Sequence, residues 1–219
     1  MRIIVSGASG IGKTTLCRDL AARLSIPYLE EDYHDIIISR NALLRLLESK
    51  DSSQDSLKKA YAHYEMACVN WIKRRIEWRR NHDSYVADRC TADLLHTWIS
   101  SSFSIDTSRT LNLLTQACAD EIRHINLAVV PPLMQLSKSE PRNESQLARG
   151  NKIENRLKAH ASIIGLLHIF QAGDKLLMLK TTPGKQDSRE QRVMDVLHWA
   201  EQSGHSLIPN GDQELRQPQ

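Results

Sequence analysis

The chain has 219 residues, of which 29 are Lys or Arg and 26 are Asp or Glu, so its formal net charge is only +3. This length predicts one compact α/β domain, and the nearly balanced charge neither requires nor excludes a nucleic-acid partner. The four cysteines stand far apart, without the paired spacing of a zinc site. They exclude a disulfide-rich secreted scaffold and favour reduced thiols in a cytoplasmic protein.

The N-terminal stretch predicts a strand, a phosphate-binding loop and a helix. Residues 3–5 form a short apolar run, and apolar residues recur at helical spacing over residues 13–24. Between them, residues 7–14 (GASGIGKT) match the pattern of Gly, four residues, Gly, Lys, then Ser or Thr, whose backbone N–H groups surround phosphate oxygens. We expect a nucleotide to bind to Gly7, Ser9, Gly10, Ile11, Gly12, Lys13, Thr14 and Thr15.

Two residues of this loop carry the charge and the metal chemistry. Lys13 is expected to place its ammonium group on the outer phosphates, and Thr14 to offer its hydroxyl to Mg²⁺. The positive end of the helix that begins here points toward the same anion. The expected cofactors are therefore ATP and Mg²⁺.

Along the rest of the chain, short apolar runs alternate with longer helical stretches, which is typical of a parallel sheet with crossover helices. The expected strands are residues 2–5, 27–29, 85–87, 125–130 and 175–179. The expected helices are residues 13–24, 40–49, 54–80, 91–100, 109–124, 143–167 and 189–202. The last of these has a capping box over residues 188–191 and a stop signal at Gly204. The predicted fold class is α/β, with a doubly wound, mainly parallel five-stranded sheet.

Acidic residues follow two of the expected strands, at the edge of the sheet where ligands of such folds collect. Residues 30–35 (EEDYHD) come after the second strand, and residues 88–93 (DRCTAD) after the third. Phosphoryl transfer needs a carboxylate near the acceptor hydroxyl, and Asp32 and Asp88 are the two candidates. Asp88 is also a candidate to hold Mg²⁺ through water. The other acids of the first cluster are as well explained as solvated loop residues.

This order of motifs resembles the P-loop kinases of the nucleoside and nucleotide kinase group, especially thymidylate-kinase-like enzymes and ribosylnicotinamide-kinase-like proteins with an AAA-type kinase domain. The resemblance covers about residues 1–200. It rests on the phosphate loop, on YVADRCTAD (residues 85–93), which is similar to the family's Asp-Arg motif, and on EPRNESQLARGNKIENRL (residues 140–157), which looks like the family's lid. It implies a kinase domain over residues 1–204 with a helical lid at about 138–158. The polar residues 205–219 are expected to form a loosely ordered tail.

The resemblance also implies roles for single residues. Asp32 is the first choice for the acceptor carboxylate, because Glu-Asp-Tyr after the second strand looks like the motif with which related kinases hold the acceptor hydroxyl. Arg89 would contact a phosphate of the acceptor or oxygens near it. Arg142 and Arg149 would bring positive charge to the migrating phosphoryl group, since seven residues are two helical turns and both can face one side.

Aromatic and basic residues alternate over residues 61–80, which are predicted to be helical. A buried stripe is expected from Tyr64, Cys68, Trp71 and Trp78. Beside it, a basic margin is formed by Lys73, Arg74, Arg79 and Arg80. This margin is typical of a solvated helix face, and it could also grip a nucleic-acid strand through phosphate contacts and stacking.

These patterns predict an ATP-dependent kinase that transfers the γ-phosphoryl group to a hydroxyl or phosphate of a nucleoside or nucleotide-like acceptor. Two alternatives stay open: a DNA kinase acting on a hydroxymethylated base (5-hydroxymethyluracil type) or a nucleic-acid end, and a slow nucleotide-binding regulatory protein. An AAA+ motor is disfavoured because Asp88 is followed by Arg89, where a motor needs Glu. The longest apolar run, residues 161–170, is too short to span a bilayer, so no membrane partner is expected. The sequence does not predict the oligomeric state.

Overall fold

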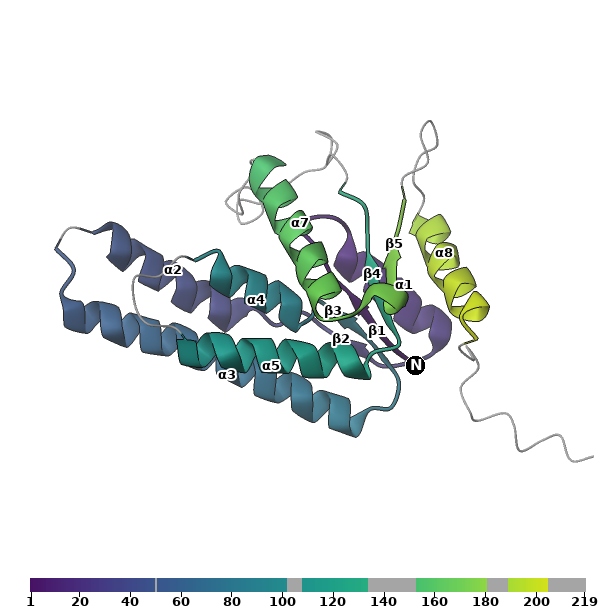
Figure 1. Ribbon diagram of the computed structural model, residues 1–219, viewed down its shortest axis with the longest axis horizontal. Helices are drawn as coiled ribbons and strands as arrows, with labels where there is room; N and C mark the ends of the chain where they lie inside the picture. The colour runs from purple at the N-terminus through teal and green to yellow at the C-terminus, as the bar shows by residue number, and fades with distance from the viewer. Residues whose placement is uncertain (50, 102–107, 134–152, 181–188, 205–219) are drawn as a thin grey trace, which may run out of the picture.

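The computed structural model describes residues 1–49, 51–101, 108–133, 153–180 and 189–204, and within them five parallel strands form one sheet (Figure 1). The strands are β1 (Arg2–Val5), β2 (Tyr28–Leu29), β3 (Tyr85–Asp88), β4 (Leu127–Val130) and β5 (Leu176–Met178). They lie in the order β2-β3-β1-β4-β5, and every neighbouring pair is parallel. The predicted fold class is confirmed, and the ends of the five strands differ from expectation by no more than two residues.

Helices connect the strands at nearly all the expected places. They are α1 (Lys13–Leu24), α2 (His34–Glu48), α3 (Gln54–Asn81), α4 (Thr91–Ile99), α5 (Ser108–His124), α7 (Ile153–Ile169) and α8 (Arg189–Gln202), with a 3-10 turn at Gly173–Lys175. Three expected features lie outside the described residues: the start of the helix at 143, Ser188 of the capping box, and the tail. The stop signal is confirmed, because Gly204 has a φ of 73° just after α8.

One helix boundary differs clearly from the prediction. Helix α2 begins at His34 instead of residue 40. Tyr33 and Ile36 are buried there, and the ring of Tyr33 meets that of Trp71 on α3 edge-on, with centroids 5.1 Å apart. The run of isoleucines over residues 36–38 has low helix propensity, so tertiary packing rather than local preference sets this boundary.

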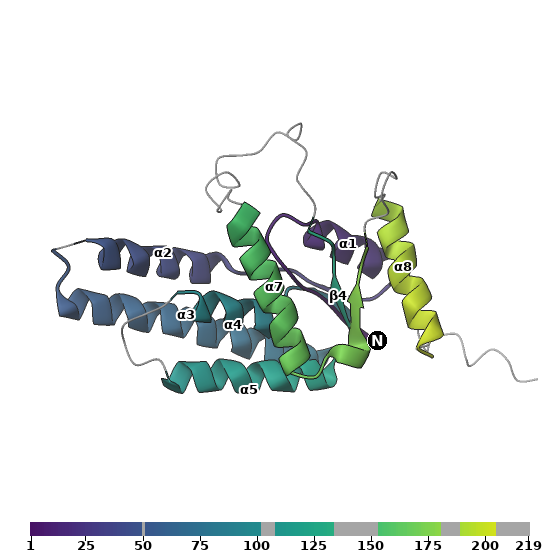
Figure 2. The same ribbon diagram turned by 45° about the horizontal axis from the view of Figure 1, so that its top comes forward.

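Alternate strand residues enter two separate apolar clusters, one on each face of the sheet. Ile3 and Val5 of β1 pack with apolar residues of α1 and α8, whereas Ile4 packs with apolar residues of α3, α4, α5 and α7. Figure 2 shows α7 on one side of the sheet and α8 on the other. The helices α2 and α3 run side by side well beyond the sheet in both views. No described helix is long and apolar enough to cross a membrane.

The expected buried stripe on α3 is confirmed, but its basic margin is only partly a solvated face. Tyr64, Cys68 and Trp71 are buried, and Trp78 packs on the same cluster. Arg79 is buried as well, and its Nη2 donates to Oδ2 of Asp120 on α5 at 2.5 Å. Arg74 pairs with Asp32 across 2.9 Å. The four cysteines are free and buried, as expected for Cys17 and Cys118.

Candidate active site

The loop between β1 and α1 has the backbone that a phosphate-binding loop requires. Gly7, Gly10 and Gly12 have φ values of 123°, 75° and 85°, which strongly favour glycine. Space is also limiting at Gly7, where a Cβ atom would lie 2.9 Å from Cδ1 of Ile11 and 3.1 Å from Nδ1 of His160. The loop conformation therefore depends on glycine for two independent reasons.

Lys13 is buried in the centre of this loop. Its ammonium group donates to the carbonyl oxygen of Ala8 at 2.7 Å. Burial, reinforced by the neighbouring charge of Arg89, lowers the pKa of Lys13 to about 8. A phosphate anion bound by the loop would favour the charged form of Lys13 and oppose that shift.

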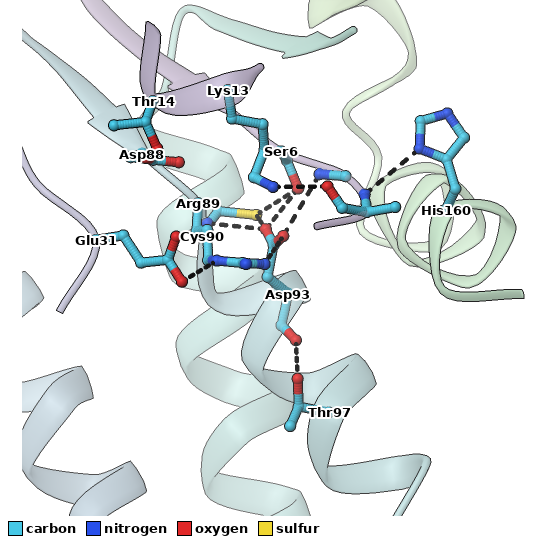
Figure 3. A network of polar contacts seen from close by, with 12 residues as sticks. Ser6, Lys13, Thr14, Glu31, Asp88, Arg89, Cys90, Asp93, Thr97 and His160 are labelled. Atoms are coloured by element: carbon cyan, nitrogen blue, oxygen red, sulfur yellow. Dashed lines mark hydrogen bonds and ion pairs between the residues drawn. The ribbon is translucent and has the colours of Figure 1, made fainter. Parts of the chain in front are cut away.

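Thr14 and Asp88 form the part of the site that fits a metal ion. Oγ1 of Thr14 donates to Oδ2 of Asp88 at 2.5 Å (Figure 3). Asp88 is buried at the end of β3, and its Oδ1 has no hydrogen-bond partner within the described parts of the chain. Burial raises the pKa of Asp88 although Thr14 and Lys13 act against it.

Hard oxygen donors of this kind suit Mg²⁺, which the unpartnered Oδ1 could bind directly or through water. The described residues contain no group of three or more His, Cys, Asp or Glu side chains able to hold a metal. A Mg²⁺ ion here would therefore take most of its ligands from phosphate oxygens and water, as is usual for this ion in nucleotide sites.

Arg89 lies between two carboxylates, as Figure 3 shows. Its Nε is 2.6 Å from Oε1 of Glu31, and its Nη1 donates to Oδ1 of Asp93 at 3.3 Å. The guanidinium carbon lies 5.0 Å from the ring centroid of Tyr33. The positive charge of Arg89 is thus compensated by two neighbouring negative charges and a ring face.

Asp93 connects this cluster to the phosphate loop. Its Oδ2 accepts hydrogen bonds from Oγ of Ser6 at 2.5 Å and from the backbone N–H of Cys90 at 3.0 Å. Its Oδ1 accepts from the N–H of Gly7 at 3.4 Å. One buried carboxylate therefore joins the start of the loop, the start of α4 and the guanidinium of Arg89.

The backbone at Arg89 is held by a buried ion pair from α3 and α5. Arg89 has a φ of 67°, which is strained for a residue with a side chain. Nη2 of Arg75 donates to the Arg89 carbonyl at 2.8 Å and to Oε1 of Glu121 at 2.8 Å. The other carboxylate oxygen of Glu121 accepts from the N–H and hydroxyl of Thr91 at 2.6 and 2.5 Å. These contacts keep the turn after β3 in its strained conformation.

A cavity of about 300 Å³ opens beside Thr14 and Asp88. Its lining is formed by Thr14, Glu30, Glu31, Tyr33, His34, Ile37 and Asp88. It therefore joins the edge of the phosphate loop at Thr14 and Asp88 to the residues that follow β2, which is where the sequence predicts the acceptor.

The predicted carboxylate Asp32 does not line this cavity. Its side chain is 60% exposed and pairs with Arg74. The neighbouring Glu31 faces the cavity instead, and its side chain is 22% exposed. Both lie in the same acidic cluster, and of the two only Glu31 lines the cavity. Asp88, Arg89 and the loop residues 7–15 are brought together as expected, whereas Arg142 and Arg149 lie outside the described residues.

Two residues from distant helices reach the phosphate loop, and the sequence analysis missed both. The backbone N–H of Ala8 lies 3.5 Å from Nδ1 of His160 on α7 and donates to it. Nη1 of Arg192 on α8 donates to the carbonyl oxygen of Ile11 at 3.3 Å. No local sequence pattern predicts either contact, because each residue reaches the loop only when distant parts of the chain fold together.

The sequence matches the family model described as AAA domain over residues 2–172. The chain belongs to this AAA domain family. Among solved structures, this AAA domain is similar to a NadR protein in complex with NR, with a TM-score of 0.60 and 20% identity over 96% of this chain and 53% of that chain. It spans only about half the length of that NadR structure. No curated protein sequence gives a significant match.

Two kinases of similar size show the same architecture as this AAA domain. A thymidylate kinase from Candida albicans gives a TM-score of 0.54 at 14% identity, covering 95% of each chain. A deoxyadenosine kinase from M. mycoides with bound dCTP gives 0.57 at 10% identity, covering 90% of this chain and 99% of that chain. These similarities confirm that the chain has the fold of the P-loop nucleoside and nucleotide kinase group.

Proposed function

We propose that the protein is an ATP- and Mg²⁺-dependent kinase that transfers the γ-phosphoryl group to a hydroxyl of a nucleoside-like acceptor. The observation that carries this proposal is the lining of the cavity. Thr14 and Asp88 belong to the phosphate and metal edge of the site, and they share the cavity with Glu31 and Tyr33. An acceptor in this cavity would lie beside the phosphates of a nucleotide held by the loop.

The phosphate loop supplies positioning and positive charge, which are the main requirements of phosphoryl transfer. Its backbone N–H groups surround the phosphates, and Lys13 moves its donated hydrogen bond from the Ala8 carbonyl to phosphate oxygens. Thr14 and Asp88 would hold Mg²⁺, which when bound would neutralise part of the phosphate charge. Arg142 and Arg149 of the predicted lid are expected to add further positive charge.

Glu31 takes the role that the sequence analysis gave to Asp32, because Glu31 lines the cavity and Asp32 does not. The Glu31 carboxylate accepts a hydrogen bond from the acceptor hydroxyl and orients its oxygen toward the γ-phosphorus. A new P–O bond forms to that oxygen while the bond between the γ-phosphorus and the bridging oxygen breaks. The hydroxyl proton passes to Glu31, and ADP leaves with the electron pair of the broken bond. Asp88 is the second candidate for this proton.

The test measures ADP formation with a panel of acceptors and identifies the product by mass spectrometry. We expect ADP only when an acceptor and Mg²⁺ are both present. For Glu31→Gln we expect a loss of at least about a hundredfold in kcat, the lower end of the contribution of a general base. The matched control is Asp32→Asn, which changes the adjacent carboxylate and should retain most activity. ATP binding without turnover of any acceptor would favour the regulatory alternative and contradict the kinase.

A further inference from the structure

His160 comes from α7, far along the chain from the phosphate loop, and its ring lies against the start of that loop (Figure 3). The residue is only 7% exposed. Nδ1 of the imidazole accepts a hydrogen bond from the N–H of Ala8 at 3.5 Å. A Cβ atom at Gly7 would lie 3.1 Å from Nδ1 and 3.3 Å from Cε1 of the same ring. One edge of the imidazole is therefore packed against two consecutive residues of the loop.

Ala8 is held at both of its polar backbone groups. Its N–H donates to His160, and its carbonyl oxygen accepts a hydrogen bond from the ammonium group of Lys13 at 2.7 Å. Lys13 is the residue expected to bring positive charge to the phosphates. A change in the backbone angles of Ala8 that breaks the first contact would also displace the acceptor of the second. His160 can therefore act on Lys13 through the backbone of a single residue.

The first two N–H groups of the loop are bound by side chains. The N–H of Gly7 donates to Oδ1 of Asp93 at 3.4 Å, and the next N–H donates to His160. Asp93 lies on α4 and His160 on α7, two helices that pack against each other. A phosphate group would then be held by N–H groups further along the loop. This arrangement suits a residue that fixes where the loop begins, and not one that contacts the phosphate.

We infer that His160 is a positioning residue for nucleotide binding, which holds the start of the phosphate loop in place through its neutral imidazole ring. This inference rests on the proposed function, because it takes the loop to bind the phosphates of ATP. A nitrogen that accepts a hydrogen bond carries no proton, so the neutral ring has its proton on Nε2. An imidazolium has no such acceptor, and its Nδ1–H would repel the N–H of Ala8.

Charged groups from three elements face the His160 ring. Lys13 of α1 and Arg156 of α7 disfavour its protonation, whereas Asp93 of α4 favours it. Burial has the largest effect, and it lowers the pKa of His160 below its ordinary value. The neutral ring is therefore the form present at pH 7. The contact with Ala8 should be lost as the pH falls below about 6.5.

The test measures equilibrium binding of AMP-PNP with Mg²⁺ to the parent protein and three variants. His160→Leu removes the acceptor, and His160→Asn replaces Nδ1 with an amide oxygen that accepts a hydrogen bond and does not titrate. His168→Leu is the matched control, because His168 is an exposed histidine about two turns further along α7. At pH 7 we expect Kd to rise about threefold to tenfold in His160→Leu, the effect of losing one hydrogen bond, and to stay near the parent value in the other two variants.

The dependence of binding on pH is a measurement that a merely structural role would not change. Between pH 7 and pH 5 we expect Kd of the parent and of His168→Leu to rise at least about twofold more than Kd of His160→Asn. The ATP analogue and the other groups of the site titrate in all four proteins, so only the difference between variants is compared. The same pH dependence in the parent and His160→Asn would overturn the inference. Tighter binding at pH 5 in the parent but not in His160→Asn would also overturn it, because the imidazolium would then contact the phosphates directly.

Failure of this inference and failure of the kinase proposal give different results. Binding of AMP-PNP needs no acceptor, so a protein that phosphorylates none still shows whether His160 controls nucleotide affinity. If His160→Leu does not fold, the comparison of the parent with His160→Asn across pH decides the question. A lower Tm with an unchanged Kd in His160→Leu would leave His160 a purely structural role. Acceptor-dependent ADP formation with a parent-like KM for ATP in His160→Leu would support the kinase proposal and refute the role of His160, whereas a parent that does not bind AMP-PNP would refute both.

Discussion

The buried pair of Arg75 and Glu121 allows the sharpest test of how this site is supported. Their side chains are 6% and 3% exposed, and two hydrogen bonds join the guanidinium to Oε1 of Glu121 at 3.1 and 2.8 Å. Burial alone would raise the pKa of Glu121, but Arg75 and Thr91 outweigh it and hold that pKa below its usual value. Both groups are thus charged and depend on each other.

Changing Glu121 to Gln leaves the guanidinium of Arg75 buried without a counter-charge. Removing one partner of such a pair costs about 3–5 kcal/mol of unfolding free energy. For a chain of 219 residues, one kcal/mol corresponds to about 2–4 °C in Tm, so we expect Tm to fall by roughly 6–20 °C. Scanning calorimetry and urea unfolding of the parent and the variant measure this difference.

A double variant, Arg75→Met with Glu121→Leu, removes both charges together. Apolar replacement of a buried ion pair is often nearly neutral, so we expect the double variant to recover at least half of the stability lost in Glu121→Gln. It also loses the hydrogen bond from Arg75 to the Arg89 carbonyl. The kcat of phosphoryl transfer should therefore stay low although stability returns.

Three results would refute parts of this reasoning. An unchanged Tm in Glu121→Gln would mean that the charge of Arg75 is solvated and not buried as the structure has it. A double variant whose loss equals the sum of the losses in Arg75→Met and Glu121→Leu would mean that the two residues act independently. Full kcat in a stable double variant would show that the strained turn at Arg89 needs no support from α3.

Three further predictions concern single positions. The affinity for ATP should fall as pH rises through about 8, because the charged form of Lys13 is lost above its lowered pKa; titrations from pH 7 to 9 check this, and Lys13→Ala should bind weakly at every pH. Gly165→Ala should stabilise the protein by about 0.5–1 kcal/mol, since Gly165 lies within α7 with nothing within 4 Å of its added Cβ; a lower midpoint in urea would contradict this. Arg142→Ala and Arg149→Ala should each lower kcat at least tenfold and leave Tm unchanged; parent-like kcat in both would rule out the lid.

Most of the fold could be predicted because its signals are local. The strands are short apolar runs, the helices have 3.6-residue periodicity, and the loop GASGIGKT is one contiguous segment whose conformation depends on its own glycines. The start of α2 was misplaced because Tyr33 packs on Trp71 of α3 and Ile36 is buried in the same core cluster. The residues next to Tyr33 in the sequence do not predict its contact with Trp71.

By itself, the sequence determined the phosphate loop, the order of the strands along the chain and the two segments that meet at the edge of the sheet. Only the tertiary structure decided which side chains face the cavity. Glu31 and Asp32 are adjacent carboxylates, yet one pairs with Arg89 in the site and the other with Arg74 on the long helix. The direction of a side chain after a strand depends on the partners that the fold brings from elsewhere, and here those partners come from residues 74 and 89. For the same reason, the pairing of Arg89 with Glu31 and Asp93 is a property of the assembled site.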